Sequence, residues 1–98
     1  MKINTVVIGS GKIAEEYLKV LKTFKMFNIT GIYSRNKKNL FKFCSSNNVN
    51  YFESINEIKR IKKKIDLIIY LVSAPNLLKI LNQTTEIDCI KLLEKPLG

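Results

Sequence analysis

The sequence has no histidine and no tryptophan, and its only two cysteines, Cys44 and Cys89, stand far apart. The absence of histidine excludes Cys/His and Ser/His catalytic pairs and the common zinc sites, so no metal site is expected. The longest apolar run, at 67–72, falls far short of the ~20 residues of a membrane-spanning helix, and no cleavable apolar leader follows Met1. We therefore expect a cytoplasmic protein without a membrane partner, whose cysteines are small buried or half-buried side chains.

Acidic residues are scarce: 17 Lys and Arg face 8 Asp and Glu, which gives a formal net charge of +9. Such a charge has two explanations, a partner made of phosphate or a composition rich in lysine, isoleucine and asparagine. A nucleic-acid surface should cluster arginine with aromatic residues, but only Arg35 and Arg60 are present and the lysines are spread along the chain. The composition is the better explanation, and we expect no nucleic-acid partner.

Ninety-eight residues leave room for one domain, and its apolar residues predict alternating strands and helices. Strands are expected at 3–8, 29–33, 49–52, 66–72 and 90–93, with 49–52 as a short edge strand. Helices are expected at 12–25, from an Asn36 cap to 45–48, from a Ser54 cap through Ile61, and from Pro75 through Leu81. Strands separated by helices indicate a doubly wound parallel sheet, an α/β fold of the Rossmann type. Segment 66–72 is apolar on both faces, which predicts helices on both sides of it.

The first strand-to-helix turn reads Gly9-Ser10-Gly11-Lys12-Ile13-Ala14, a GxGxxA pattern. Gly9 permits a tight turn, Gly11 lets a pyrophosphate approach the backbone, and Ala14 lets the helix lie against the sheet. Because the amides that begin the helix bind phosphate, we expect residues 9–13 to contact a dinucleotide. The alternative is a tight turn whose glycines serve packing only.

The end of the second strand normally decides which dinucleotide is preferred, because an acid there binds the ribose 2′-hydroxyl of NAD. This chain has no acid at that position and instead has Ser34 and Arg35. A charge-assisted hydrogen bond from Arg35 to a 2′-phosphate contributes about 1.5–3 kcal/mol, a roughly ten- to hundredfold preference for NADP. The cofactor is thus expected to be NADP, with NAD as the second choice, unless Arg35 is only a solvated turn residue.

Three motifs together resemble the N-terminal domain of the Gfo/Idh/MocA oxidoreductase family. They are the glycine pattern at 9–14, Ser73-Ala74-Pro75-Asn76, and Glu94-Lys95-Pro96. The resemblance spans essentially the whole chain, and the Glu-Lys-Pro motif is its most specific part. It implies that Lys95 is the catalytic residue, which hydrogen-bonds the reacting substrate oxygen as a hydride moves to or from the cofactor. It further implies that Pro96 fixes the backbone through a cis bond, that Glu94 sets the local geometry and belongs to the cofactor-binding residues, and that residues 73–76 line the cofactor cleft.

Two of these motifs have simpler alternative interpretations. In these, Lys95 is a surface lysine that follows a strand, and residues 73–76 only cap a helix. The chain also departs from the family at two places. Tyr17 stands where many members have a histidine, and 77–79 carries no histidine after the proline turn. Substrate contacts are therefore not predicted.

The resemblance implies that residues 1–98 are the dinucleotide-binding, N-terminal part of a longer enzyme whose C-terminal substrate domain is absent. Such an enzyme would transfer a hydride between the nicotinamide and a hydroxyl or carbonyl group of a sugar, polyol or sugar-nucleotide. The chain alone is expected to bind cofactor without turnover, and its open sheet edge favours a homo-oligomer. The alternative function is a non-catalytic, Rossmann-type nucleotide-binding regulatory module.

Overall fold

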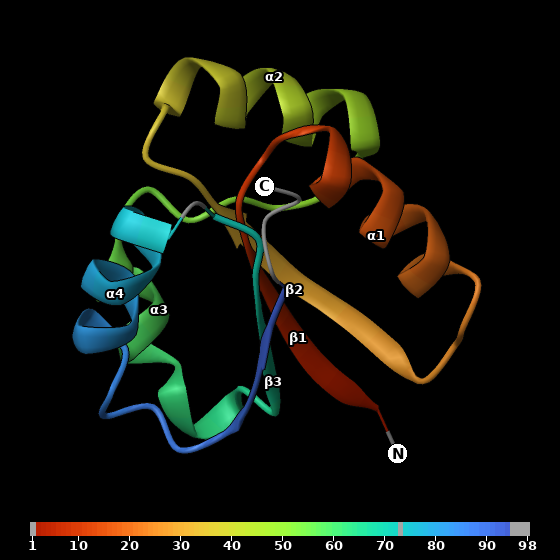
Figure 1. Cartoon of the computed structure of the whole chain (residues 1–98). Helices are drawn as coiled ribbons and strands as arrows, with labels where there is room; N and C mark the ends of the chain where they lie inside the picture. The colour runs from red at the N-terminus through yellow and green to blue at the C-terminus, as the bar shows by residue number, and fades with distance from the viewer. Residues whose placement is uncertain (1, 73, 95–98) are drawn as a thin grey trace.

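A single parallel sheet forms the centre of the structure, a computed structural model that describes residues 2–72 and 74–94. Its strands are β1 (Ile3–Ile8), β2 (Phe27–Tyr33), β3 (Leu67–Tyr70) and β4 (Ile90–Leu93). They lie side by side in the order β2-β1-β3-β4 (Figure 1), and every neighbouring pair is parallel. The predicted parallel α/β fold is confirmed.

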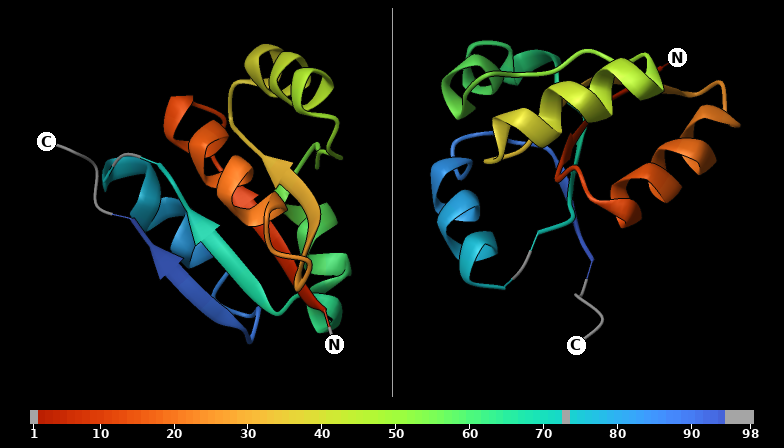
Figure 2. Two further views of the ribbon diagram at one scale, coloured as in Figure 1. Left: turned by 90° about the vertical axis from the view of Figure 1, so that its right-hand side faces the viewer. Right: turned by 90° about the horizontal axis from the view of Figure 1, so that it is seen from above.

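Helices cover both faces of this sheet, as the views in Figure 2 show for α1 and α4. The helical elements are α1 (Lys12–Lys22), α2 (Lys37–Asn47), α3 (Ile55–Arg60), the 3₁₀ turn η1 (Lys62–Lys64) and α4 (Ala74–Gln83). Two predicted caps are confirmed: the side chain of Asn36 accepts a hydrogen bond from the amide of Asn39, and Ser54 accepts one from the amide of Glu57. These caps fix where α2 and α3 begin.

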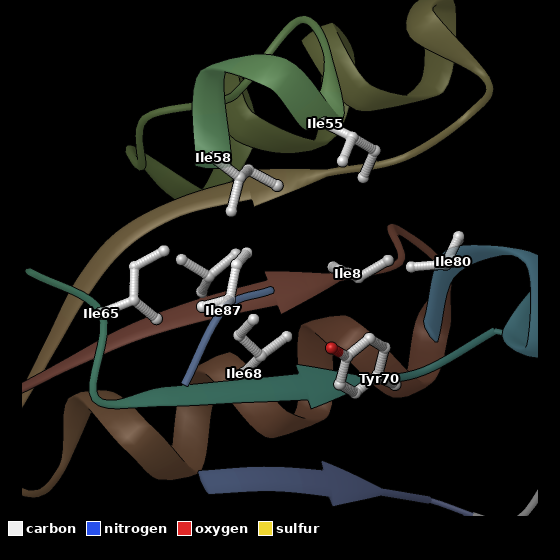
Figure 3. Close-up of a cluster of buried hydrophobic side chains, with 9 residues drawn as sticks. Ile8, Ile55, Ile58, Ile65, Ile68, Tyr70, Ile80 and Ile87 are labelled. Carbon is white, nitrogen blue, oxygen red and sulfur yellow. The ribbon is translucent and has the colours of Figure 1, made fainter. Parts of the chain in front are cut away.

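Two apolar clusters, one on each face, hold the layers together. The cluster on the side of α1 and α2 contains Val7, Leu18, Leu21, Ile32, Leu40, Phe43, Cys44 and Ile69. The cluster on the side of α3 and α4, shown in Figure 3, contains Ile8, Ile55, Ile58, Ile65, Ile68, Tyr70, Ile80 and Ile87. β3 supplies side chains to both clusters, which confirms that this strand is covered on both sides. The buried hydroxyl of Tyr70 lies 2.8 Å from that of Thr84, so its polar atom is satisfied.

The first helix is shorter than predicted, and the second strand begins earlier. The helix ends at Lys22 because both the amide and the hydroxyl of Thr23 donate to the carbonyl of Val20. The chain then turns, and β2 begins at Phe27 with the ring of Phe24 edge-on against it, 6.3 Å between centroids. Apolar periodicity assigned Phe24 to the helix, but its contact is with the following strand.

The strand predicted at 49–52 is reduced to a single bridge between Tyr51 and Ile32. The backbone of Ile32 donates to Asn50 and accepts from Phe52, at 3.1 and 2.8 Å. A longer strand cannot form there because the amide of Val49 still bonds to the end of α2 and the α3 cap follows directly. The described part of the sheet therefore has four strands where five were predicted.

Some large apolar side chains within the predicted helices are exposed, namely Ile13, Phe24, Phe41 and Leu78. Phe41 and Leu78 each follow a residue that packs inward, and the 3.6-residue period turns them away from the sheet. The cysteines agree with the prediction, since Cys44 is buried and Cys89 half-buried. Burial raises the pKa of both thiols.

β4 is an edge strand and pairs only with β3 among the described residues. Its side chains Ile90 and Leu92 are 72% and 43% exposed. Within 2–72 and 74–94, none of the helices has the length and apolar character needed to cross a membrane, and no cluster of acidic or sulfur side chains has the makeup of a metal site.

Candidate functional site

A cleft of about 540 Å³ opens where the carboxyl ends of β1, β2 and β3 meet. The turns before α1, α2 and α4 lie at this same end of the sheet (Figure 1). In parallel α/β sheets, ligands bind at this end, where one crossover connection leaves to one side of the sheet and the next leaves to the other. In this sheet that point lies at β1. The cleft is lined by Ile8, Gly9, Ser10, Gly11, Ser34, Arg35, Asn36, Asn39, Leu71, Val72, Asn76 and Ile80.

Gly9 is required by the backbone of the turn. Its φ of +131° is a conformation that L side chains rarely adopt, and an added Cβ would lie 2.7 Å from the carbonyl oxygen of Leu71. The amide of Gly9 donates to the carbonyl of Tyr33 over 2.7 Å, so the turn is tied to the end of β2. Packing and geometry alone account for this glycine.

Gly11 differs, because nothing lies within 4 Å of the position where its Cβ would stand. Its φ of −87° and ψ of −169° suit any residue, so packing alone does not account for glycine here. It is the N-cap of α1, and no side chain caps the helix. Because Gly11 lines the cleft, α1 begins at the cleft without a side-chain cap, at the positive end of the helix dipole. Open space at Gly11 beside free helical amides fits a pyrophosphate.

Arg35 lies across the cleft from the start of α4. Its guanidinium donates a hydrogen bond to the side-chain oxygen of Asn76, which joins the β2–α2 loop to the first turn of α4. The described lining residues include no carboxylate. A phosphate at this end of the cleft would therefore meet a cation without a competing acid, which fits the 2′-phosphate of NADP.

A second side-chain pair lies beside the end of β4. The hydroxyl of Tyr17 in α1 donates a hydrogen bond to the carboxylate of Glu94. This bond, with a smaller contribution from burial, raises the pKa of Tyr17. The amide of Glu94 donates to the carbonyl of Tyr70 over 3.2 Å, which continues the β3–β4 ladder by one residue. Sequence reasoning missed this pair, and its only signal was that Tyr17 departs from the family pattern.

The structure brings together six of the residues predicted to contact cofactor: Gly9, Ser10, Gly11, Ser34, Arg35 and Asn76. Lys12, Ile13, Pro75 and Glu94 are exposed and do not line the cleft. Ala74 begins α4, whereas Ser73, Lys95 and Pro96 lie outside the described residues. Asn36 and Asn39 line the cleft and were not predicted to. Their only sequence signal was a polar stretch after the second strand.

Comparison with known proteins gives one family. The sequence profile of the "Oxidoreductase family, NAD-binding Rossmann fold" matches residues 3–98. No curated protein matches the chain.

Several solved structures share the fold. The dehydrogenase MviM from Clostridium difficile has a TM-score of 0.80 and 28% identity, covering 100% of this chain and 32% of its own. A 3-ketoreductase from Actinomadura kijaniata, solved with NADP and TDP-benzene, has a TM-score of 0.79 and 21% identity. The match covers 100% of this chain and 30% of the ketoreductase. GenD2 from gentamicin A biosynthesis, solved with NAD, has a TM-score of 0.83 and 16% identity. The match covers 98% of this chain and 27% of GenD2. The chain thus spans about a third or less of each of these proteins.

Proposed function

The chain belongs to the Gfo/Idh/MocA family of oxidoreductases with an NAD-binding Rossmann fold, and we propose that residues 1–98 are the cofactor-binding part of an NADP-dependent enzyme. The observation that carries this proposal is the open space at Gly11 beside the uncapped start of α1. The reaction is a hydride transfer between the nicotinamide and a hydroxyl or carbonyl group of a sugar, polyol or sugar-nucleotide. The 3-ketoreductase solved with TDP-benzene and NADP supports this class of substrate.

The residues of the cleft divide the binding of the dinucleotide between them. The amides that begin α1, with Ser10 and Gly11, hold the pyrophosphate. Ser34 and Arg35 at the end of β2 hold the adenosine ribose, where the guanidinium of Arg35 pairs with the 2′-phosphate. Asn76, at the opposite wall, accepts from Arg35 and keeps that side chain over the cleft.

Lys95 is the proposed catalytic residue, through the resemblance of Glu94-Lys95-Pro96 to the family motif. The cofactor, when bound, supplies or accepts the hydride. The ammonium of Lys95 donates a hydrogen bond to the reacting oxygen of the substrate and assists transfer of its proton. Residues beyond this chain supply the substrate site, so the chain alone binds cofactor without turnover.

Titration of the chain with NADPH and with NADH, followed by nicotinamide fluorescence, tests the proposal. Arg35→Ala is the informative variant, and Arg60→Ala is its matched control, because Arg60 is exposed at the end of α3 and does not line the cleft. We expect the wild-type chain to bind NADPH about ten- to a hundredfold more tightly than NADH. Arg35→Ala should remove this preference, whereas Arg60→Ala should keep it.

The outcomes separate the parts of the proposal. Equal affinity of the wild-type chain for both dinucleotides would refute the role of Arg35 but would still support the proposal that the chain binds a nicotinamide dinucleotide. Failure of both to bind to a chain that circular dichroism shows to be folded would contradict the proposed function itself.

A further inference from the structure

The hydrogen bond between Tyr17 and Glu94 joins the helix that begins at the glycine turn to the strand that precedes the Glu-Lys-Pro motif. The two residues are 77 positions apart in the sequence. Tyr17 lies about 8 Å along α1 from its first residue, at 1.5 Å per residue. One rigid helix therefore carries both the proposed pyrophosphate site at its start and the partner of Glu94.

The ring of Tyr17 is held in place, which makes its hydroxyl a fixed point. It packs against the apolar cluster on the α1 side of the sheet, whose buried members include Leu18 and Leu21 of the same helix. Glu94, by contrast, is exposed and follows an edge strand. The hydroxyl therefore orients the carboxylate, and not the reverse.

The carboxyl end of β4 makes few hydrogen bonds with the rest of the described structure. Among the described residues, this edge strand pairs only with β3, and the last backbone hydrogen bond is donated by the amide of Glu94 to the carbonyl of Tyr70. The Tyr17 hydroxyl adds an attachment from a different element, on the same residue. Glu94 is thus fixed at its backbone by β3 and at its side chain by α1, directly before Lys95.

We propose that Tyr17 is a positioning residue that, through Glu94, sets where Lys95 lies relative to a dinucleotide bound at the start of α1. This inference rests on the proposed function, because it takes Lys95 as the catalytic residue. A purely structural role would make the hydrogen bond a small contribution to stability and would leave Lys95 unaffected.

Competitive acetylation of lysines, read by peptide mass spectrometry with and without saturating NADPH, tests the proposal on the full chain. The variant is Tyr17→Phe, which removes only the hydroxyl, and the matched control is Tyr51→Phe, an exposed ring that packs on Phe41 away from the cleft. We expect NADPH to slow acetylation of Lys95 relative to Lys63, an exposed lysine of η1.

In Tyr17→Phe this protection of Lys95 should fall about fivefold, as expected for one hydrogen bond to a charged acceptor near the surface. The affinity for NADPH should stay within about threefold of wild type, since Tyr17 does not line the cleft. Tyr51→Phe should change neither quantity. If Tyr17→Phe keeps the full protection of Lys95 while binding NADPH, the positioning role is refuted and the proposed function stands. If the wild-type chain binds NADPH but leaves Lys95 as reactive as Lys63, the catalytic role of Lys95 is contradicted, and the positioning role with it.

A titration of the tyrosines by ultraviolet absorbance checks that the pair forms in solution. Because Glu94 raises the pKa of Tyr17 above its ordinary value of 10.0, Glu94→Gln should lower that pKa while an acceptor oxygen is retained. The Tyr17 signal is the difference between each protein and its Tyr17→Phe counterpart. An unchanged pKa of Tyr17 in Glu94→Gln would overturn the proposal, because Tyr17 would then not be bound to the carboxylate.

Discussion

Gly11→Asp should make the protein more stable and weaken its cofactor binding strongly. The added side chain has room, since nothing lies within 4 Å of the Cβ position, and the φ of −87° suits any residue. Aspartate is among the best N-cap residues, and α1 has no side-chain cap to lose. The capping hydrogen bond and the helix dipole together contribute about 1 kcal/mol. In a domain of this size that raises Tm by about 4–8 °C.

The same carboxylate would occupy the position proposed for the pyrophosphate. Two like charges about 4 Å apart near a protein surface repel by about 4 kcal/mol, and the carboxylate would also take the amides that the phosphate needs. We therefore expect the affinity for NADPH to fall by at least about a hundredfold, which corresponds to about 2.7 kcal/mol. The assays are thermal unfolding by circular dichroism and NADPH titration by fluorescence.

Gly9→Ala is the contrasting control, two residues away in the same motif. Its φ of +131° and the 2.7 Å separation between the new Cβ and the Leu71 oxygen make this substitution destabilising. The expected loss is on the order of 3 kcal/mol, from backbone strain and overlap together. The reasoning is refuted if folded Gly11→Asp binds NADPH within about threefold of wild type, because the pyrophosphate then does not lie at this helix start. A Gly9→Ala variant as stable as wild type would show that the turn geometry is wrong.

Two further predictions concern the surface. Hydrogen bonds from Lys62 and Lys59 hold the pKa of Glu86 below its ordinary value of 4.5. A carboxyl group whose pKa is lowered in the folded state stabilises the fold at pH values above its pKa in the unfolded state. This stabilisation is lost as the pH falls through its pKa in the folded state. Glu86→Gln should therefore lower Tm slightly at neutral pH and leave it unchanged well below pH 4.5, and an equal decrease at both pH values would contradict the ion-pair role. Lysine at both Ile90 and Leu92, which are 72% and 43% exposed on β4, should reduce self-association measured by light scattering. A wild-type chain that stays monomeric at high concentration would remove the premise of that second prediction.

The elements that the sequence predicted well are those specified by local chemistry. β1 and β4 have the predicted bounds, and α2 and α3 begin at their predicted caps, because a short apolar run or a capping side chain acts within a few residues. The end of α1 and the strand at 49–52 were predicted wrongly because the apolar pattern does not reveal short-range backbone contacts: Thr23 bonds back to Val20 and ends the helix. Phe24 packs on the next strand, and Val49 stays bonded to the end of α2.

In the site, by contrast, the division is between local pattern and tertiary contact. A glycine pattern and a cation after the second strand are local, and the structure brings Gly9, Gly11 and Arg35 together in one cleft. The partners of Arg35 and Tyr17 are distant in the chain, 41 and 77 residues away. A single sequence does not specify such side-chain pairs, which depend on how α1, α4 and β4 pack around the sheet.

The glycine pattern itself combines two constraints that the structure separates. The backbone fold itself requires glycine at position 9. Its positive φ and the clash of an added Cβ with the carbonyl oxygen of Leu71 exclude a side chain, whatever the cleft binds. The fold does not require glycine at position 11, because the conformation and surroundings there accept any residue and another residue would cap the helix better. A residue that weakens the fold where a stabilising one would fit indicates that the position is used for binding. For this reason Gly11, and not the glycine pattern as a whole, is the evidence for a dinucleotide in this cleft.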